Sequence, residues 1–86
     1  MENKVLVKLI VPEISEVFDV FLPVNEVVWK IKKMLVKCIT DIDNVSFDSN
    51  KDFLLIKKEN SKVYSNNELI INTDIRNATE LVLISK

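Results

Sequence analysis

The sequence predicts one α+β domain, in which a single helix packs across a mixed sheet of four to five strands. Two observations support this fold class. Apolar residues alternate with a period of two before Pro23 and again near the end of the chain, and between these stretches they follow a helical period of about 3.6. The 86 residues, 48% of them apolar, are enough for one small core. The expected domain spans residues 1–86.

Two strands joined by a short turn open the chain. Apolar side chains alternate from Lys4 to Val11 and again from Val17 to Leu22. Pro12 begins the break between them, because its ring removes a backbone donor and fixes its own φ angle. The short connection predicts an antiparallel hairpin. One face of this hairpin carries Val5, Val7, Leu9, Val11, Phe18, Val20 and Leu22, and the other carries Leu6, Ile10, Val17 and Phe21.

A helix is expected from about Asn25 to Thr40. Asn25 is a favourable N-cap residue, and Glu26 suits the positive end of the helix dipole. Cys38 is expected to be a buried structural residue, because it lies on the apolar stripe and the chain has no histidine to deprotonate it. Trp29 and Val36, seven positions apart, should lie together at the edge of the polar face. The apolar stripe consists of Val24, Val28, Ile31, Leu35, Cys38, Ile39 and Ile42.

Three shorter strands complete the predicted sheet. Phe53–Lys58 is the third strand, and it is too uniformly apolar for its inward face to be assigned. Lys62–Tyr64 can return as a short fourth strand, and Glu68–Ile71 suggests a helical turn. Thr79–Ile84 is the last strand. This order of elements is that of a β-grasp fold, in which the first and last strands lie side by side in parallel.

Composition argues against several kinds of chemistry. The chain has no histidine and no glycine, so histidine acid–base catalysis and glycine-rich phosphate loops are not expected. A net charge of −1 does not favour nucleic acid as a partner. The single cysteine suits a reducing compartment, and we find no signal-peptide core and no apolar run of about 20 residues. We therefore expect a cytoplasmic protein without membrane insertion, catalytic residues or cofactors.

The aspartate-rich stretch Asp41–Asp52 resembles a calcium-binding loop only superficially. Val45 occupies a ligand position, and Ser46 replaces the glycine that the sharp turn of such a loop requires. We interpret the stretch as a solvated loop, anchored by Val45 and Phe47, and expect no metal site.

The outer faces of the strands are unusually apolar for a solvated sheet. Two interpretations remain open: dispersed strand-forming residues without a function, or a contiguous patch that binds a partner or a second copy of the chain. A smaller second patch is formed by Trp29 and Val36. We favour the sheet patch because strands present several apolar side chains next to one another. The candidate binding residues of the sheet patch are Ile10, Leu54, Ile56, Val82 and Ile84.

The chain resembles ubiquitin-like proteins over nearly its whole length. Leu6-Val7-Lys8 is similar to the Phe-Val-Lys of the first strand of ubiquitin, and Ile75–Leu83 is similar to its final isoleucine, turn and strand. Phe18–Pro23 resembles the Tyr-Asp-Leu-x-Val-Pro signature of the EsaB/YukD family, accessory proteins of type VII (WXG-type) secretion in Gram-positive bacteria. The chain departs from the pattern at Asn77-Ala78, where the turn before the last strand usually has a glycine.

This resemblance implies a non-enzymatic, cytoplasmic adaptor or regulator that binds a secretion-system protein through non-covalent contacts. The family lacks a Gly-Gly tail. Because this chain ends in Ser85-Lys86, we expect no adenylation of its C-terminus by an activating enzyme. Two alternatives remain: a self-associating β-grasp module with an unrelated partner, and a divergent modifier or sulfur carrier with residues beyond Lys86.

Overall fold

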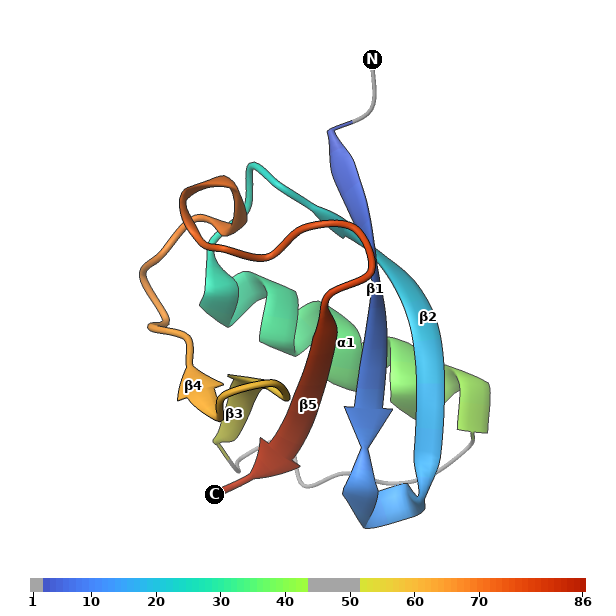
Figure 1. The fold of residues 1–86 in the computed structure, drawn as a ribbon. Coiled ribbons are helices and arrows are strands. Elements are labelled where there is room, and N and C mark those ends of the chain that lie inside the picture. The colour runs from blue at the N-terminus through green and yellow to red at the C-terminus, as the bar shows by residue number, and fades with distance from the viewer. Residues whose placement is uncertain (1–2, 44–51) are drawn as a thin grey trace.

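Five strands form one mixed sheet in the order β2-β1-β5-β3-β4, and a single helix packs across one face of that sheet (Figure 1). The computed structural model describes residues 3–43 and 52–86. Strands β1 and β5 are parallel and the other neighbouring pairs are antiparallel, as the β-grasp prediction requires. The elements are β1 Lys4–Val11, η1 Pro12–Ile14, β2 Glu16–Pro23, α1 Val28–Asp43, β3 Phe53–Lys57, β4 Lys62–Val63, η2 Ile70–Asn72 and β5 Glu80–Ser85.

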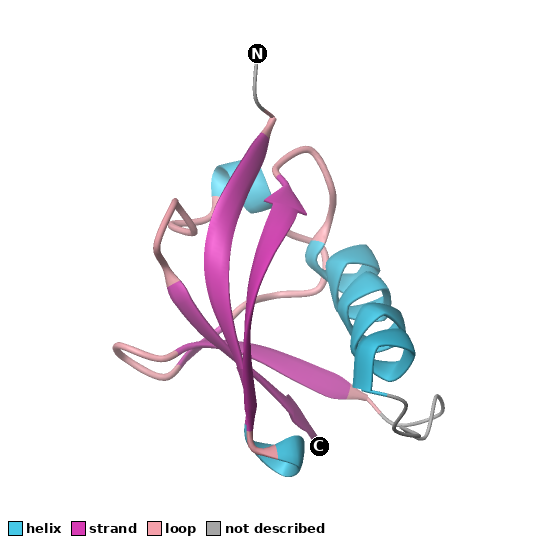
Figure 2. Cartoon of the chain, turned by 90° about the vertical axis from the view of Figure 1, so that its right-hand side faces the viewer, coloured by secondary structure: helices cyan, strands magenta, loops and turns pink. Residues whose placement is uncertain are grey.

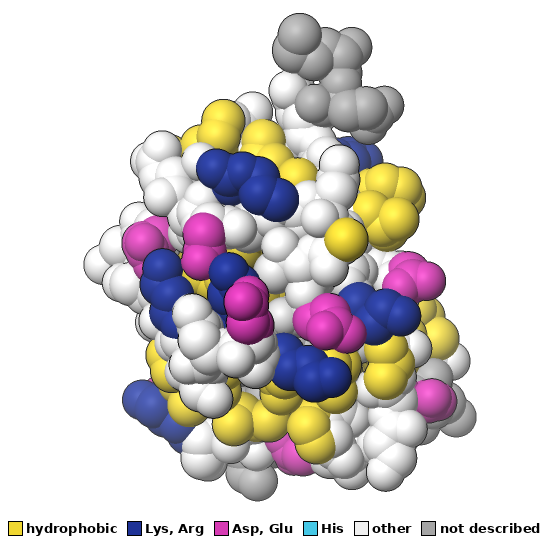
Figure 3. Space-filling model, viewed as in Figure 1, with side chains coloured by type: hydrophobic (Ala, Val, Ile, Leu, Met, Phe, Trp, Pro, Cys, Tyr) yellow, Lys and Arg dark blue, Asp and Glu magenta, His cyan; other side chains and the backbone are white. Residues whose placement is uncertain are grey.

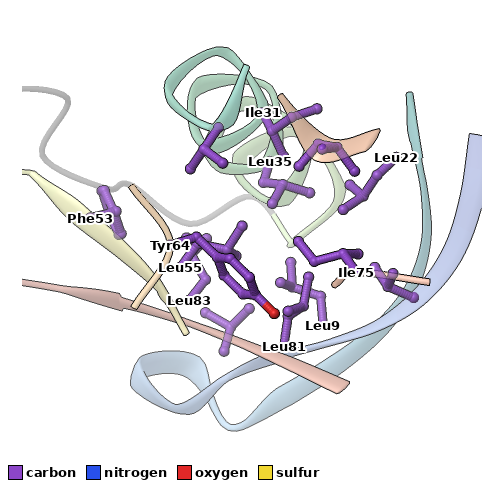
Figure 4. Packing of buried hydrophobic residues seen from close by; sticks show 14 of the residues in the cluster. Leu9, Leu22, Ile31, Leu35, Phe53, Leu55, Tyr64, Ile75, Leu81 and Leu83 are labelled. Atoms are coloured by element: carbon purple, nitrogen blue, oxygen red, sulfur yellow. The ribbon is translucent and has the colours of Figure 1, made fainter. Parts of the chain in front are cut away.

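The core lies between the sheet and α1, which form two layers in Figure 2. The predicted alternation in β1 is confirmed, because Val7, Leu9 and Val11 are buried against the helix. Strand β3, whose inward face could not be assigned from the sequence, buries Phe53 and Leu55. Side chains from both layers meet in Figure 4. The largest fully buried ones are Leu9, Leu22, Ile31, Leu35, Leu55, Ile70, Ile75, Leu81 and Leu83.

The predicted start of the helix was wrong. The helix begins at Val28 and not at Asn25, because Val27 pairs with Leu69 in an isolated β-bridge. Backbone carbonyls from another part of the chain then satisfy the first helical N–H groups. The N–H of Val28 donates to the carbonyl of Glu68 at 2.9 Å, and that of Trp29 donates to the carbonyl of Asn66 at 3.1 Å. The helix is therefore capped by tertiary contacts and needs no N-cap side chain.

Two predicted members of the apolar stripe are exposed, and a third, Val24, precedes the helix and is only partly buried against the core. Cys38 is exposed, which contradicts its assignment as a buried residue. Ile42 is 66% exposed, because the last turn of α1 extends past the edge of the sheet beside β2 (Figure 1). The stripe that packs on the sheet is therefore narrower and shorter than predicted. It consists of Val28, Ile31, Leu35 and Ile39.

The turn that leads into β5 places an alanine where glycine would be favoured. Ala78 has a φ of 72°, in the left-handed region. The N–H of Thr79 donates to the carbonyl of Arg76, so Ala78 is the third residue of this turn, the position at which a type II turn requires positive φ. The turn is fastened to β1, because the N–H of Leu6 donates to Oδ1 of Asn77 at 2.8 Å. The absence of the usual glycine therefore leaves a strained alanine in the turn.

Replacing Ala78 with glycine should stabilise the protein. The left-handed conformation costs a non-glycine residue about 1–2 kcal/mol, and part of that gain is offset by the greater freedom of glycine in the unfolded chain. We expect a net gain of about 0.5–1 kcal/mol in the free energy of unfolding, measured by urea titration. Asn67→Gly is the control, since the φ of Asn67 is not positive. An Ala78→Gly variant that is less stable than the wild type would contradict this account.

Candidate protein-binding site

The face of the sheet opposite α1 carries a continuous apolar row across all five strands. Its members are Cα partners in successive strand pairs: Val17 with Ile10, Ile10 with Val82, Val82 with Ile56, and Ile56 with Val63. Adjacent strands lie about 4.8 Å apart, so the row extends over roughly 20 Å. Its two ends are open to solvent, since Val17 is 54% and Val63 52% exposed, whereas the three central residues are half-buried.

A second apolar pair lies beside this row. Leu54 and Ile84 are Cα partners between β3 and β5, and both are half-buried on the same outer face. The structure therefore brings together the predicted set Ile10, Leu54, Ile56, Val82 and Ile84. These positions form one contiguous surface and are not dispersed. The role of that surface in binding stays a prediction.

A charged row separates this surface from a smaller apolar patch. Asp19 of β2 and Glu80 of β5 are the Cα partners of Lys8 on its two sides. Beyond them, Leu6 and Phe21 are paired and are 40% and 59% exposed. In Figure 3, which views this face, a belt of basic and acidic side chains crosses the middle and hydrophobic side chains gather below it. The larger patch is thus bordered by charges on one side.

Sequence reasoning missed Val63 as a member of this surface. Strand β4 contains two residues, Lys62 and Val63, and a segment of this length is too short to show an alternation of apolar and polar residues. Only the pairing of Val63 with Ile56 assigns it to the outer face. Val17 was assigned correctly to the outer face but not included among the candidate binding residues. Its place at the end of the row follows from the register with Ile10.

A polar cluster holds β4 in position at the edge of the sheet. The hydroxyl of Tyr64 donates to Oδ1 of Asp74 at 2.7 Å, and Nζ of Lys57 donates to Oδ2 at 3.0 Å. These two hydrogen bonds lower the pKa of Asp74 to about 2, and the bond from Tyr64 has the larger effect on it. The pKa of the Tyr64 hydroxyl is raised above its usual range, mainly because the side chain is partly buried and secondly because it is hydrogen-bonded to Asp74. The cluster ties the segment before β5 to β3 and β4, and thereby positions Val63.

The cluster of Asp74, Tyr64 and Lys57 should make the free energy of unfolding depend on pH under acidic conditions. The pKa of this carboxyl lies near 2 in the folded protein and near 3.8 in the unfolded chain, so as the pH falls the unfolded chain takes up the proton first. The stabilisation is therefore complete above about pH 3.8 and is lost as the pH falls towards 2. Because the Asp74 side chain is 42% exposed, we expect it to contribute about 1 kcal/mol or less.

Urea unfolding at pH 7, 4 and 2.5 measures this dependence. Asp74→Asn keeps an oxygen acceptor for Tyr64 but removes the charge, so it should be less stable at pH 7 and lose less stability on acidification. Glu59→Gln is the control, since the Glu59 side chain is 79% exposed and lies 3.7 Å from Lys57. Equal acid dependence of Asp74→Asn and the wild type would contradict the assignment.

The second predicted patch, Trp29 and Val36, lies on the other side of the molecule. Both side chains line one groove between α1 and the start of β3. Trp29 is 41% exposed and Val36 is half-buried. The two residues therefore line the same groove, although Val36 also packs against the core, and their function stays a prediction.

Within residues 3–43 and 52–86, no three cysteine or acidic side chains are grouped so that they could hold a metal ion. Most of the aspartate-rich stretch Asp41–Asp52, including Val45 and Phe47, lies outside the described residues. Across the described ranges, no helix has the length and apolar character needed to cross a membrane.

Comparisons with known proteins support the fold. No family model matches the sequence, and no curated protein matches it. The solved structure of the "MycP5-free ESX-5 inner membrane complex, State II" contains a similar chain, with a TM-score of 0.82 and 13% identity; the likeness covers 99% of this chain and 21% of that one. This chain therefore corresponds to about a fifth of the length of that neighbour.

Two further structures show the same architecture. The EccD5 ubiquitin-like domain from Mycobacterium xenopi has a TM-score of 0.72 and 9% identity, covering 99% of this chain and 97% of that domain. A chain of the toluene 4-monooxygenase HD complex has a TM-score of 0.79 and 7% identity, covering 96% and 99%. At such low identity these likenesses establish the fold alone. The protein has a ubiquitin-like β-grasp fold, with a five-stranded mixed sheet and one packed helix.

Proposed function

We propose that this protein is a non-enzymatic, ubiquitin-like adaptor or regulator of a bacterial type VII secretion system. It acts in the cytoplasm of a Gram-positive bacterium by binding a protein component of that system non-covalently. The observation that carries the proposal is the apolar row across the open sheet face, from Val17 to Val63. A solvated sheet face would be mostly polar, whereas this one presents several aliphatic side chains in register.

Two lines of support connect this surface to secretion. The likeness to an ESX-5 membrane complex and to an EccD5 domain is compatible with such a role, although the same fold also occurs in a monooxygenase complex. The resemblance of Phe18–Pro23 to the EsaB/YukD signature points in the same direction. The fold permits many functions, so the assignment depends on the binding surface and on this sequence signature together.

Deletion of the gene from its own bacterium tests the proposal. We expect the export of WXG-type proteins to change, as measured by immunoblotting of culture supernatants against cell lysates. A plasmid copy of the wild type should restore export, and a folded Val82→Asp variant should not. Unchanged export in the deletion strain would contradict the proposed function. Genes for an FtsK/SpoIIIE-type ATPase and WXG-type substrates beside this one would support it.

Self-association is the second candidate function, and the same surface favours it. Val17 and Phe21 of the edge strand β2 are both more than half exposed. An edge strand with exposed apolar side chains can pair with a second copy of the chain. Sedimentation velocity over a range of concentrations distinguishes the two, since a monomer at all concentrations would exclude a self-associating module.

A further inference from the structure

A basic groove with an aromatic wall lies between α1 and the start of β3. Helix α1 lines it with Trp29, Lys32, Lys33 and Val36, and the opposite wall consists of Asp52, Phe53 and Asn66. Its volume is about 360 Å³, within the range of sites that hold small ligands or peptide side chains.

Trp29 gives the groove an apolar surface framed by positive charge. Trp29 is 41% exposed, whereas a tryptophan that served only the core would be largely covered. The Nζ atoms of Lys30 and Lys33 lie 5.6 Å and 5.8 Å from the ring centroid. Of these two lysines, Lys33 lines the groove together with Val36, and its cation–π contact holds the ammonium group beside the indole.

Lys32 places a second ammonium group in the groove wall. Its Nζ donates to the backbone carbonyl of Phe53 at 2.7 Å, and the side chain is partly buried. An ammonium group has three donors, and a carbonyl oxygen neutralises none of its charge. Burial lowers the pKa of Lys32, and the nearby charge of Asp52 only partly offsets this effect, so the ammonium group lacks full compensation. A carboxylate entering the groove would provide this compensation.

The first ten residues of the helix carry an excess of positive charge. The stretch Val28–Lys37 contains Lys30, Lys32, Lys33 and Lys37 but no acidic residue, although the whole chain has a net charge of −1. Cations in the first turns of a helix are repelled by its dipole. Within residues 3–43 and 52–86 the recorded salt bridges involve Lys57 and Lys62 and none of these helix lysines. One carboxylate, that of Asp52, belongs to the described groove wall.

We propose that this groove binds an acidic peptide segment of a partner protein. An apolar side chain of that segment packs against Trp29 and Val36, and flanking carboxylates pair with Lys32 and Lys33. The inference goes beyond the function proposed above, because the groove lies on the helix side of the sheet and the apolar row lies on the opposite face. The two sites can therefore be occupied independently.

The groove suits a peptide better than an anionic membrane. A membrane-binding helix presents a broad apolar face to the lipid, usually with several large apolar side chains. Here only two apolar side chains of the helix, Trp29 and Val36, line the groove, and the large buried residues of α1 already pack on the sheet. Binding to anionic vesicles in place of peptide is thus an outcome that would overturn the proposal.

Trp29 provides a site-specific readout, since it is the only tryptophan of the chain. The probe is a synthetic peptide of sequence Glu-Asp-Glu-Leu-Phe-Asp-Glu, titrated at low salt while tryptophan emission is recorded. We expect a saturable change in emission and a loss of affinity as the salt concentration rises. A second peptide with Gln and Asn in place of the acids should bind at least about tenfold more weakly, because the charge pairs supply much of the recognition.

Matched variants locate the site. Lys33→Glu should reduce the affinity for the acidic peptide by about tenfold. Lys58→Glu makes the same change in charge at an exposed position beyond the opposite end of β3, and it should leave the affinity nearly unchanged. Val82→Asp, on the sheet face, should also bind the peptide normally. Circular dichroism of each variant establishes that it is folded.

Four results would overturn the proposal. The first two are the absence of a saturable change in Trp29 emission up to millimolar peptide, and equal affinities for the acidic and the neutral peptide. The third is an equal loss of peptide affinity in Lys33→Glu and Lys58→Glu, and the fourth is a response to vesicles containing 30% phosphatidylserine without a response to peptide. None of them depends on whether the sheet face binds a secretion protein. An experiment that disproves peptide binding in the groove therefore leaves the proposed secretion function untouched, and the two proposals can be tested separately.

Discussion

Replacing Leu35 with alanine is expected to lower the free energy of unfolding by about 2–5 kcal/mol. Leu35 is 1% exposed and lies in the middle of the helix stripe that packs on the sheet. Truncation removes its buried methyl groups and leaves a cavity between α1 and the strands (Figure 4). Because a domain of this size is stable by only about 5–10 kcal/mol, the variant should unfold at a much lower urea concentration.

The matched control is Ile42→Ala on the same helix. Ile42 is 66% exposed, so its truncation should cost less than about 0.5 kcal/mol. Both variants can be measured by circular dichroism and by Trp29 fluorescence during urea unfolding. A cost below about 0.5 kcal/mol for Leu35→Ala would show that the packing of α1 on the sheet is wrongly assigned.

Charged substitutions on the sheet face are expected to abolish partner binding while the fold is retained. Val82 lies in the centre of the apolar row, between its Cα partners Ile10 and Ile56. Binding energy in an interface is concentrated in a few central apolar anchors, whose loss costs about 2 kcal/mol or more. Val82→Asp or Ile84→Asp should therefore weaken association with a secretion component, or with a second copy, by at least about 30-fold.

The controls separate this effect from unfolding and from charge alone. Val63→Asp alters the solvent-exposed end of the row, so it tests the surface even if Val82→Asp does not fold. Ile71→Asp introduces the same charge at a residue that is 52% exposed and lies outside the five strands. Trp29→Ala should have a smaller effect on this partner. If folded sheet-face variants bind like the wild type and Trp29→Ala does not, the helix groove is the main site.

Strand alternation and helical period predicted most of the fold. Val7, Leu9 and Val11 are buried as their spacing indicates, and β1 and β5 are parallel as the order of elements requires. Single positions near the ends of the helix were predicted less well. Cys38 is exposed because it lies at the margin of the stripe, beside the buried Ile39. Ile42 is exposed because a period identifies a helical face and not how far the sheet extends beneath it.

The candidate site was predicted in part. The outward positions Ile10, Val82 and Ile84 follow from alternation alone, whereas Leu54 and Ile56 were included although the face of their strand could not be assigned. That these residues form one continuous row depends on register, since a shift of one residue would turn a strand's apolar set to the other face. The groove beside Trp29 has its opposite wall in β3 and the segment before η2, which no local pattern connects to the helix.

The sequence by itself determined the fold class, the inward positions of the first, second and last strands and the apolar character of the outer face, because hydrophobic periodicity is local and depends on nearby residues. The tertiary structure alone decided where α1 begins, since the carbonyls that cap it come from Asn66 and Glu68. It also decided that Val17 and Val63 lie at the two ends of one row and that lysines frame an exposed indole. These features depend on contacts between distant segments, whose geometry is set when the sheet and helix pack together.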